Sequence, residues 1–285
     1  MASLRKQMQL LALRAAFQTA GRAAPGQAAR VAERIFCRPP AARPRPSEAE
    51  FLATGTPLSF KTCAGTLAGW SWGAGPVALL VHGWGSRAAR FRVLAPALVS
   101  AGMRVVAYDG PGHGLSPGTE TNLPEYATVL QEVTEQLGPL EAVAGHSLGG
   151  AAIAVALFRG LTIRRAVLIA PFGAAADFVD RFAELIGLPA AAQQQMVVNL
   201  ERRLGFHFSD FIIADLVKQL STPVLVIHDR DDEDIPLAEG EAIAAAWPGA
   251  RFHRTAGLGH HAIMRDAETA RLVARFMSER GGIGG

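Results

Sequence analysis

Residues Gly145 to Gly150 read Gly-His-Ser-Leu-Gly-Gly, and they decide the fold expected for this chain. The run follows a short apolar stretch at 142–144 and precedes a run of small residues at 149–158. Glycines on both sides of Ser147 allow a sharp strand-to-helix turn, in which the serine is strained and its hydroxyl projects into a cleft. The helix that follows points its first N–H groups at the site, where they favour negative charge. A chance glycine-rich turn is the alternative, and the flanking patterns disfavour it.

Apolar runs alternate with helical patterns on both sides of this turn. The expected strands cover residues 58–63, 67–72, 77–81, 104–108, 142–144, 166–170, 223–227 and 251–254. The expected helices cover residues 88–101, 124–137, 149–158, 237–247 and 262–280. This alternation predicts an α/β fold with a mostly parallel central sheet and helices on both faces.

One interval, 171–221, has helical patterns but no convincing strand. We interpret about 172–220 as a helical cap inserted over the carboxyl edge of the sheet, where open α/β sheets bind ligands. Most of its apolar side chains must pack the cap itself. Because ligand pockets are predominantly apolar, some are expected to face the cleft, and Phe172, Phe178 and Phe182 are the candidates for substrate binding.

Composition and charge exclude several classes of protein. Of 285 residues, 49% are hydrophobic and 19% charged, so the chain can bury enough apolar surface to fold. Residues 1–50 hold nine Lys and Arg against three acidic residues, whereas 51–285 hold 19 against 22. The body therefore has no basic excess, which disfavours nucleic-acid binding. We assign 1–50 to a basic N-terminal helix with a proline-rich linker, and 51–285 to one domain with its cap.

The N-terminal segment is expected to be helical over about 3–20. Two apolar stripes run along that helix, one through Leu4, Met8, Leu11 and Ala15, the other through Leu10, Leu13 and Phe17. Two stripes favour packing against protein or weak peripheral contact with lipid. Arg14 interrupts the apolar run, which argues against a secretory signal, and no stretch is long enough for a membrane span. With only Cys37 and Cys63, reduced thiols and a cytoplasmic protein are expected.

Two further loops carry residue types suited to nucleophilic catalysis. His82-Gly-Trp-Gly85 directly follows the strand 77–81, and the backbone N–H groups of Trp84 and Leu148 are expected to form an oxyanion hole. Trp84 is also a candidate wall of the substrate pocket. Gly-Leu-Gly at 257–259 precedes His260, which is the expected general base for the Ser147 proton.

An acidic loop supplies candidates for the third member. The strand 223–227 runs into His-Asp-Arg-Asp-Asp-Glu-Asp-Ile-Pro at 228–236, and one of these aspartates must orient the imidazole. The adjacent pair His260 and His261 lacks the i, i+4 spacing of helical zinc ligands. No metal ion and no cofactor are therefore expected.

These motifs together resemble the α/β-hydrolase superfamily over roughly 57–280. The resemblance rests on the loop at 82–85, the Asp-Gly-Pro-Gly-His-Gly-Leu-Ser turn at 109–116, the Ser147 turn, the acidic loop and the Gly-Leu-Gly-His run, in the family order of serine, acid and histidine. Members often read Ile-His-Gly-x-x-Asp-x-x-Val-Pro in the acidic loop. Placing Ile235 and Pro236 on that pattern selects Asp232, although Asp229 stands where glycine is usual.

The resemblance implies a serine hydrolase of carboxylic esters, with thioesterases and C–C bond hydrolases left open because they use the same triad. A non-catalytic binding protein on this fold is the much weaker alternative. The cap holds four basic against six acidic residues, which provides no clamp for acyl-CoA phosphates. The expected partner is a small-molecule ester with a small to medium apolar acyl group, and the oligomeric state is left open.

Overall fold

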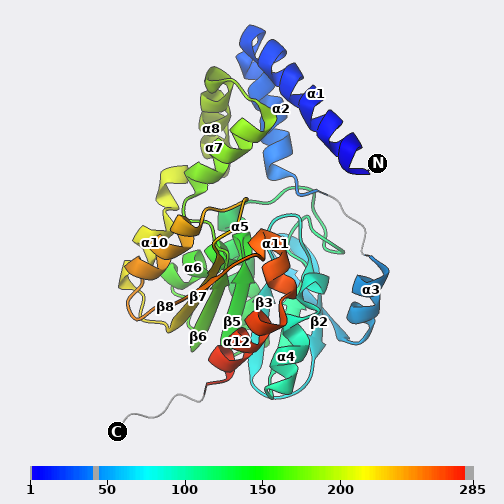
Figure 1. Cartoon of the computed structure of the whole chain (residues 1–285), viewed down its shortest axis with the longest axis vertical. Helices are drawn as coiled ribbons and strands as arrows, with labels where there is room; N and C mark the ends of the chain where they lie inside the picture. The colour runs from blue at the N-terminus through cyan, green and yellow to red at the C-terminus, as the bar shows by residue number, and fades with distance from the viewer. Residues whose placement is uncertain (1, 41–44, 280–285) are drawn as a thin grey trace. The chain divides into compact units, whose positions relative to one another are not determined.

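A computed structural model describes residues 2–40 and 45–279, and it divides into two compact units (Figure 1). The larger unit comprises Pro39–Gly173 and Ile213–Gly285. The smaller unit comprises Met1–Arg38 and Ala174–Ile212, so it is assembled from two segments distant in sequence.

The larger unit is built on an eight-stranded sheet with the order β1-β2-β4-β3-β5-β6-β7-β8. The strands are β1 (Thr56–Thr62), β2 (Gly65–Trp72), β3 (Val77–Val81), β4 (Arg104–Tyr108), β5 (Ala142–His146), β6 (Arg165–Ile169), β7 (Val224–Asp229) and β8 (Arg251–Thr255). β2 pairs antiparallel with both β1 and β4, and all other pairings are parallel. The predicted mostly parallel sheet is confirmed.

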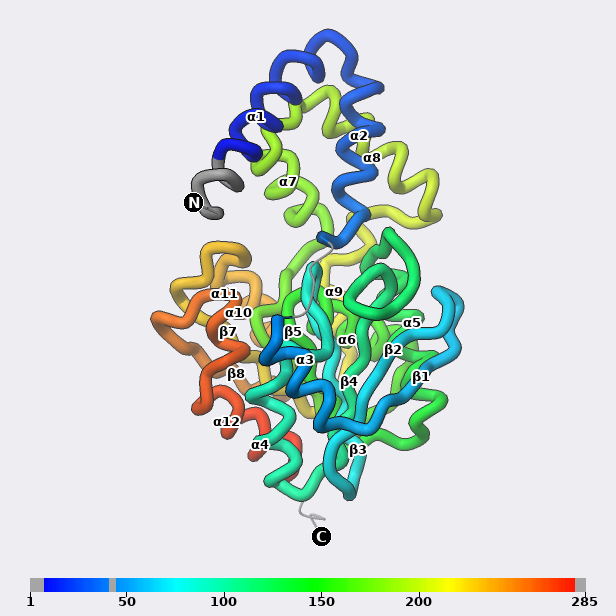
Figure 2. Tube along the Cα trace, turned by 90° about the vertical axis from the view of Figure 1, so that its right-hand side faces the viewer, coloured from blue at the N-terminus to red at the C-terminus, as the bar shows by residue number. Residues whose placement is uncertain are grey.

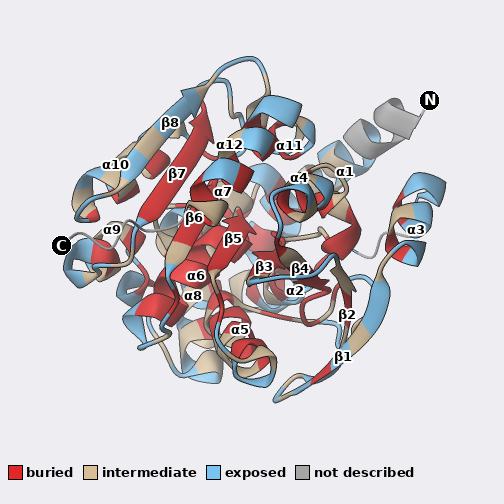
Figure 3. Ribbon diagram, turned by 90° about the horizontal axis from the view of Figure 1, so that it is seen from below, coloured by how far each residue is buried: buried red, intermediate tan, exposed pale blue. Residues whose placement is uncertain are grey.

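Helices cover both faces of this sheet. They are α3 (Pro46–Ala53), α4 (Leu94–Ser100), α5 (Leu123–Leu137), α6 (Leu148–Phe158), α9 (Ile213–Leu216), α10 (Leu237–Ala246), α11 (Gly259–Ala262) and α12 (Ala267–Ser278). α4 and α12 pack on one face and α5 and α6 on the other, so the strands between them are buried (Figure 3). β5 is buried along its whole length because it lies between β3 and β6 with helices above and below.

The larger unit begins earlier than the sequence interpretation placed it. The assignment of 1–50 to a leading segment is corrected here, because α3 belongs to the larger unit. Glu48 on α3 is buried and pairs with Arg87 at 3.6 Å and with Arg90 at 3.4 Å. These buried charges fix α3 to the loop after β3. Residues 41–44 of the expected linker lie outside the described residues.

The smaller unit contains α1 (Ala2–Ala23), α2 (Pro25–Cys37), α7 (Ala175–Ile186) and α8 (Ala190–Leu204). The sequence predicted one N-terminal helix, but Pro25 starts a second one, where its missing N–H costs nothing. α2 packs on α8 and α1, and α1 also packs on α7 (Figure 2). The N-terminal segment is thus part of the same unit as residues 174–212, whereas the sequence interpretation separated the two.

Among the described residues, no helix combines the length and the apolar character that crossing a bilayer requires.

The turn after β5 provides a test of the fold. A Cβ added to Gly149 would overlap the carbonyl oxygens of Val81 and His82, both of which are backbone atoms that cannot rotate away. We predict that Gly149→Ala lowers the free energy of unfolding by about 3 kcal/mol or more. Gly26→Ala is the control, since its Cβ meets no atom within 4 Å and should leave stability unchanged or slightly raised. Equal urea-unfolding midpoints for the two variants would contradict the described turn.

Candidate active site

Ser147 occupies a strained turn between β5 and α6. Its backbone has φ 53° and ψ −119°, and only one other non-glycine residue among those described, Ala170, has a positive φ. The conformation is held because the Ser147 N–H donates to the carbonyl oxygen of Ile169 at 2.9 Å, and its carbonyl accepts the first α6 bond from Ala151. A strained residue that its surroundings hold so firmly is typical of a functional site.

His260 lies on α11, on the loop side of the sheet where β7 and β8 end. Its Nδ1 is 2.8 Å from Oδ2 of Asp232, and the residue is 9% exposed. Its backbone carbonyl accepts a hydrogen bond from Nε2 of His146 at 2.9 Å, and the two rings lie 4.6 Å apart. His146 immediately precedes Ser147, so this bond ties the histidine loop to the serine turn.

The carboxylate of Asp232 is fully buried and saturated with donors. Oδ1 accepts the backbone N–H groups of Asp234 at 2.9 Å and Ile235 at 2.8 Å, while Oδ2 faces His260 and, at 3.4 Å, Nε2 of His228. Burial raises the pKa of Asp232, but the hydrogen bonds from His228, His260 and Ile235 outweigh it, so the pKa lies below its ordinary value. The group is a buried anion at neutral pH.

The other three aspartates of the acidic loop have different surroundings. Asp229 is buried and accepts hydrogen bonds from the N–H of Asp231, the hydroxyl of Thr255 and the N–H of Leu258. It therefore joins the end of β7 to the loop that carries His260. Asp231 is exposed and accepts the Gly257 N–H at 2.7 Å. Of the four, Asp232 is the one whose carboxylate is hydrogen-bonded to the His260 ring in the described structure.

The loop after β3 is fixed by two buried histidines. The Gly110 N–H donates to Nε2 of His82 at 2.9 Å, and Nδ1 of His82 donates to Gly83. The Gly85 N–H donates to Nε2 of His113 at 3.0 Å, and Nδ1 of His113 donates to Pro111. Each ring uses one nitrogen as donor and the other as acceptor, which is the neutral form. Burial lowers the pKa of His82 to about 4 and that of His113 to about 3.

One small pocket contains both Ser147 and His260. It has a volume of about 70 Å³ and is lined by His82, Trp84, Gly85, Ser86, Arg90, Phe91, His146, Ser147, His260, His261 and Met264. Trp84 is one of the residues that line this pocket. Leu148 is buried at the start of α6, where its N–H belongs to the first turn of that helix.

The three phenylalanines that the sequence proposed for substrate binding lie outside the described lining of this pocket. Phe172 is 4% exposed and does not belong to the described lining of the pocket. Phe178 and Phe182 pack on Phe36 of α2, with ring centroids 5.7 and 5.1 Å apart. Both contacts are with the N-terminal segment, which the sequence interpretation did not include among the packing partners of these residues. That residues 174–212 form a cap stays a prediction.

A carboxylate does lie beside the histidine pair, which the spacing argument did not foresee. Oδ2 of Asp234 is 3.5 Å from Nε2 of His261, and these residues with His260 form one group whose candidate metal-binding atoms lie within 4.8 Å of one another. Asp234 and His261 are both exposed and pair with each other. Their proximity is explained without a metal ion.

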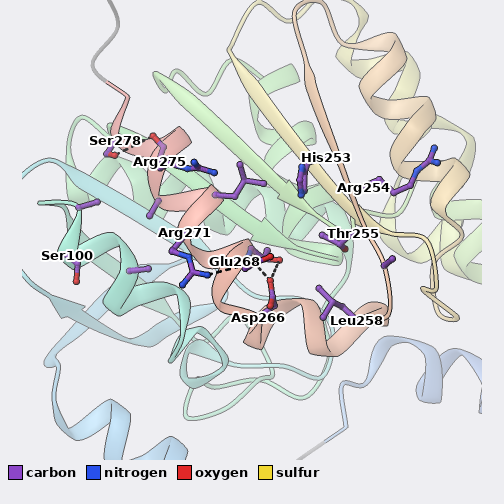
Figure 4. A pocket seen from close by; sticks show the side chains of 16 residues that line it. Ser100, His253, Arg254, Thr255, Leu258, Asp266, Glu268, Arg271, Arg275 and Ser278 are labelled. Atoms are coloured by element: carbon purple, nitrogen blue, oxygen red, sulfur yellow. Dashed lines mark hydrogen bonds and ion pairs between the residues drawn. The ribbon is translucent and has the colours of Figure 1, made fainter.

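A larger groove of about 1000 Å³ lies elsewhere on the same unit (Figure 4). It runs between α4, the end of β8 and α12, and Asp266, Glu268 and Arg271 project toward it. Neither Ser147 nor His260 lines it. The small pocket, rather than this groove, therefore holds the chemically reactive groups.

Sequence reasoning missed two residues of the site. His228 was taken only as a marker of the acidic loop, yet it touches Asp232 and donates toward the carbonyl of Ile235 at 3.0 Å. His146 was quoted only as part of the serine turn, although it binds the His260 carbonyl. In both cases the sequence shows a histidine within a strand of small or aliphatic residues, where a buried polar ring needs a partner.

Comparisons with known proteins place this geometry in a family. Residues 78–275 match the model described as the alpha/beta hydrolase family. Three curated relatives are similar over most of the chain. An uncharacterized protein of Mycobacterium tuberculosis strain H37Rv is 30% identical, covering 86% of this chain and 87% of its own length.

The other two relatives carry enzyme names. A non-heme haloperoxidase of Rhodococcus erythropolis is 26% identical, covering 70% of this chain and 90% of its own length. A pimeloyl-(acyl-carrier protein) methyl ester esterase of Aromatoleum aromaticum is 27% identical, covering 70% of this chain and 96% of its own length.

The neutral buried histidines predict how stability depends on pH. Burial lowers the pKa of His82, His113 and His146 to about 4, 3 and 3, whereas an unfolded histidine titrates near 6.5. Between about pH 6.5 and 4 the unfolded chain binds more protons than the folded one, so stability falls as pH falls. Each of the three rings should lower the free energy of unfolding by about 1.4 kcal/mol per pH unit in this range, so the total slope should approach the value for three protons.

This dependence is measured by urea unfolding at pH 7, 6, 5 and 4. His113→Asn is the informative variant, because it should lower the slope by about one proton whatever it does to absolute stability. A free energy of unfolding that stays constant from pH 7 to 4 would show that these rings are not held neutral.

Proposed function

The chain belongs to the alpha/beta hydrolase family, and on that premise we propose that it is a serine hydrolase of carboxylic esters with small to medium apolar acyl groups. One observation carries the proposal. The His260 ring, hydrogen-bonded to the buried Asp232 carboxylate, lines the same pocket as Ser147 in its strained turn. A nucleophile, a base and a group that orients the base are the three parts of such a site.

The hydrogen bonds assign the proton positions. Nδ1 of His260 carries a proton and donates a hydrogen bond to Asp232, so Nε2 is the nitrogen left to accept the Ser147 proton. Nε2 removes the hydroxyl proton as Ser147 Oγ attacks the ester carbonyl, and the imidazolium that forms is stabilised by the buried anion of Asp232. The same proton then passes to the leaving alcohol. Attack by water, activated by His260, releases the acid and regenerates Ser147.

The negative charge on the carbonyl oxygen needs donors already in place. We assign the backbone N–H groups of Trp84 and Leu148 to this role. The loop carrying Trp84 is held by His82 and His113, and a Cβ on Gly83 would come within 2.9 Å of the Ser147 Cβ. The Leu148 N–H begins α6, whose dipole adds to the stabilisation. Fixed donors of this kind contribute about 3 to 4 kcal/mol each when measured by removal.

The lining supports an uncharged, apolar acyl group. Trp84, Phe91 and Met264 supply apolar surface, and a volume of about 70 Å³ favours the short end of the acyl range. The one arginine of the lining, Arg90, is paired with Glu48 at 3.4 Å, which reduces its attraction for an acyl-CoA phosphate. The methyl ester esterase among the relatives supports ester chemistry. Thioesters and C–C bonds are open to the same triad.

We predict that Ser147→Ala and His260→Ala each abolish nearly all hydrolysis, by about 10⁴-fold or more, because nucleophile and base act as one unit. The rate is measured with p-nitrophenyl acetate, and labelling by a fluorophosphonate probe reports the nucleophile independently. Labelling of wild-type protein but not of Ser147→Ala is expected. Activity of Ser147→Ala above a few per cent of wild type would refute the assignment.

The same assay distinguishes the acids. Asp232→Asn should be nearly as damaging as the loss of His260, since it removes the anion that stabilises the imidazolium. Asp234→Asn is the matched control, being two residues away, exposed and 3.5 Å from His261. Asp229→Asn should mainly lower stability through the lost loop bonds. If Asp234→Asn were as inactive as Asp232→Asn, the register of the acid would be wrong.

A further prediction concerns acyl length. Across p-nitrophenyl esters of increasing chain length, kcat/KM should rise by up to about fourfold per methylene, the equivalent of about 0.8 kcal/mol of binding, and fall once the pocket is full. Met264→Ala enlarges the pocket and should move the maximum to longer chains. Matched acyl-CoA thioesters should be poor substrates. A flat profile, or a preference for the acyl-CoA over the simple ester, would contradict this substrate class.

A further inference from the structure

The structure distinguishes the two apolar stripes of α1. Phe17 is buried, and Leu10 and Leu13 are half-buried, so this stripe faces the other helices of the smaller unit. Met8 and Leu11 are 63% and 65% exposed, and Ala15 on the same stripe is exposed as well. Within the described part of the chain, seven of the nine large apolar side chains that are exposed belong to the smaller unit.

α2 also exposes apolar side chains, and arginines lie between them. Its buried face consists of Ala28, Ala29, Ala32 and Cys37. Its exposed face carries arginines at four-residue intervals with aliphatic side chains between them, in the order Arg30, Val31, Arg34, Ile35 and Arg38. The spacing places Arg30, Val31, Arg34 and Ile35 on one side of the helix, and Arg38 is the residue that follows its last turn.

The charges of the smaller unit are segregated. Residues 1–38 contain seven Lys and Arg and a single acidic residue, Glu33. That carboxylate accepts a hydrogen bond from Asn199 of α8 at 2.6 Å, so it is turned toward the inside of the unit. The exposed acids of the unit are Asp177, Asp180 and Glu184 on α7, together with Asp210 after α8. The outer faces of α1 and α2 therefore present arginines and apolar groups without a neutralising carboxylate of their own.

We propose that these outer faces, carried by Met8, Leu11, Arg30, Val31, Arg34 and Ile35, dock the protein on an anionic lipid surface. Aliphatic side chains of this size enter the boundary between headgroups and acyl chains, while arginines between them bind lipid phosphates. The acidic face of α7 is repelled by the same surface, which fixes the orientation of the unit. A water-exposed helix face needs no such alternation of arginine with Val and Ile.

Flotation of the full-length protein with vesicles tests this surface. Binding is expected to phosphatidylcholine vesicles that contain phosphatidylglycerol, to be lost at high salt, and to be absent from pure phosphatidylcholine. Each arginine near such a surface contributes about fivefold in partitioning, so Arg30→Glu/Arg34→Glu should weaken binding at least about 25-fold. Leu11→Glu should weaken it about tenfold or more.

Matched controls distinguish the effect of this surface from a general effect of net charge or of exposed apolar side chains. Arg271→Glu/Arg275→Glu makes the same charge change at the same i, i+4 spacing on α12, where both arginines are exposed. Leu115→Glu changes a side chain of the larger unit that is also 65% exposed. Both controls should bind vesicles as wild type does, and all four variants should keep wild-type ester turnover in solution, which shows that they fold.

Three results would overturn the proposal. The first is no binding to anionic vesicles, and the second is equal loss of binding in the control pair and in Arg30→Glu/Arg34→Glu. The third is a concentration-dependent dimer that Leu11→Glu dissociates while the wild-type protein does not bind vesicles, which would assign the apolar face to a second copy of the chain.

Discussion

The backbone of Gly149 lies so close to the carbonyl oxygens at the end of β3 that one additional carbon atom would overlap them. This contact sets how near α6 approaches the sheet, and hence where the strained Ser147 stands. It also brings the loop after β3 against the serine, since Gly83 has equally little space. Three features of the site, Ser147, the start of α6 and the loop with Trp84, are thus positioned by backbone packing before any polar interaction is added.

Polar interactions then fix what packing has brought together, and histidine serves two opposite purposes in them. His82, His113 and His146 are buried where their charged form is unfavourable, and each holds backbone groups of a neighbouring loop. His260 instead lies against a buried carboxylate, the surroundings that stabilise an imidazolium. The neighbours of each histidine, and not the residue type, therefore separate the three that hold loops in place from His260, the proposed proton carrier.

The sequence was sufficient for the parts of the molecule that depend on local backbone chemistry. The Ser147 turn needs glycines at fixed positions, and apolar runs of strand length report burial between two helical layers. The preference for Asp232 rested on its distance in sequence from Ile235 and Pro236, and the structure explains why that distance is informative, because the Ile235 N–H donates to the Asp232 carboxylate.

Contacts between segments that are distant in sequence could not be predicted from local patterns. Nothing near Phe36 indicates that it packs on Phe178, and the partner of His228 depends on how the loop after β7 folds back. The boundary at residue 50 failed for the same reason, since Glu48 is bound by arginines about 40 residues later.

The assembly of the smaller unit from two segments has a consequence for biosynthesis. α1 and α2 leave the ribosome before the roughly 135 residues that separate them from α7, and translation at about 5–20 residues per second makes that interval on the order of ten seconds. During this time the inner stripe of α1, including Phe17, has no α7 or α8 to cover it. Apolar surface that stays exposed during synthesis is prone to aggregation, so the nascent chain is vulnerable at the inner stripe of α1 until α7 and α8 have been made.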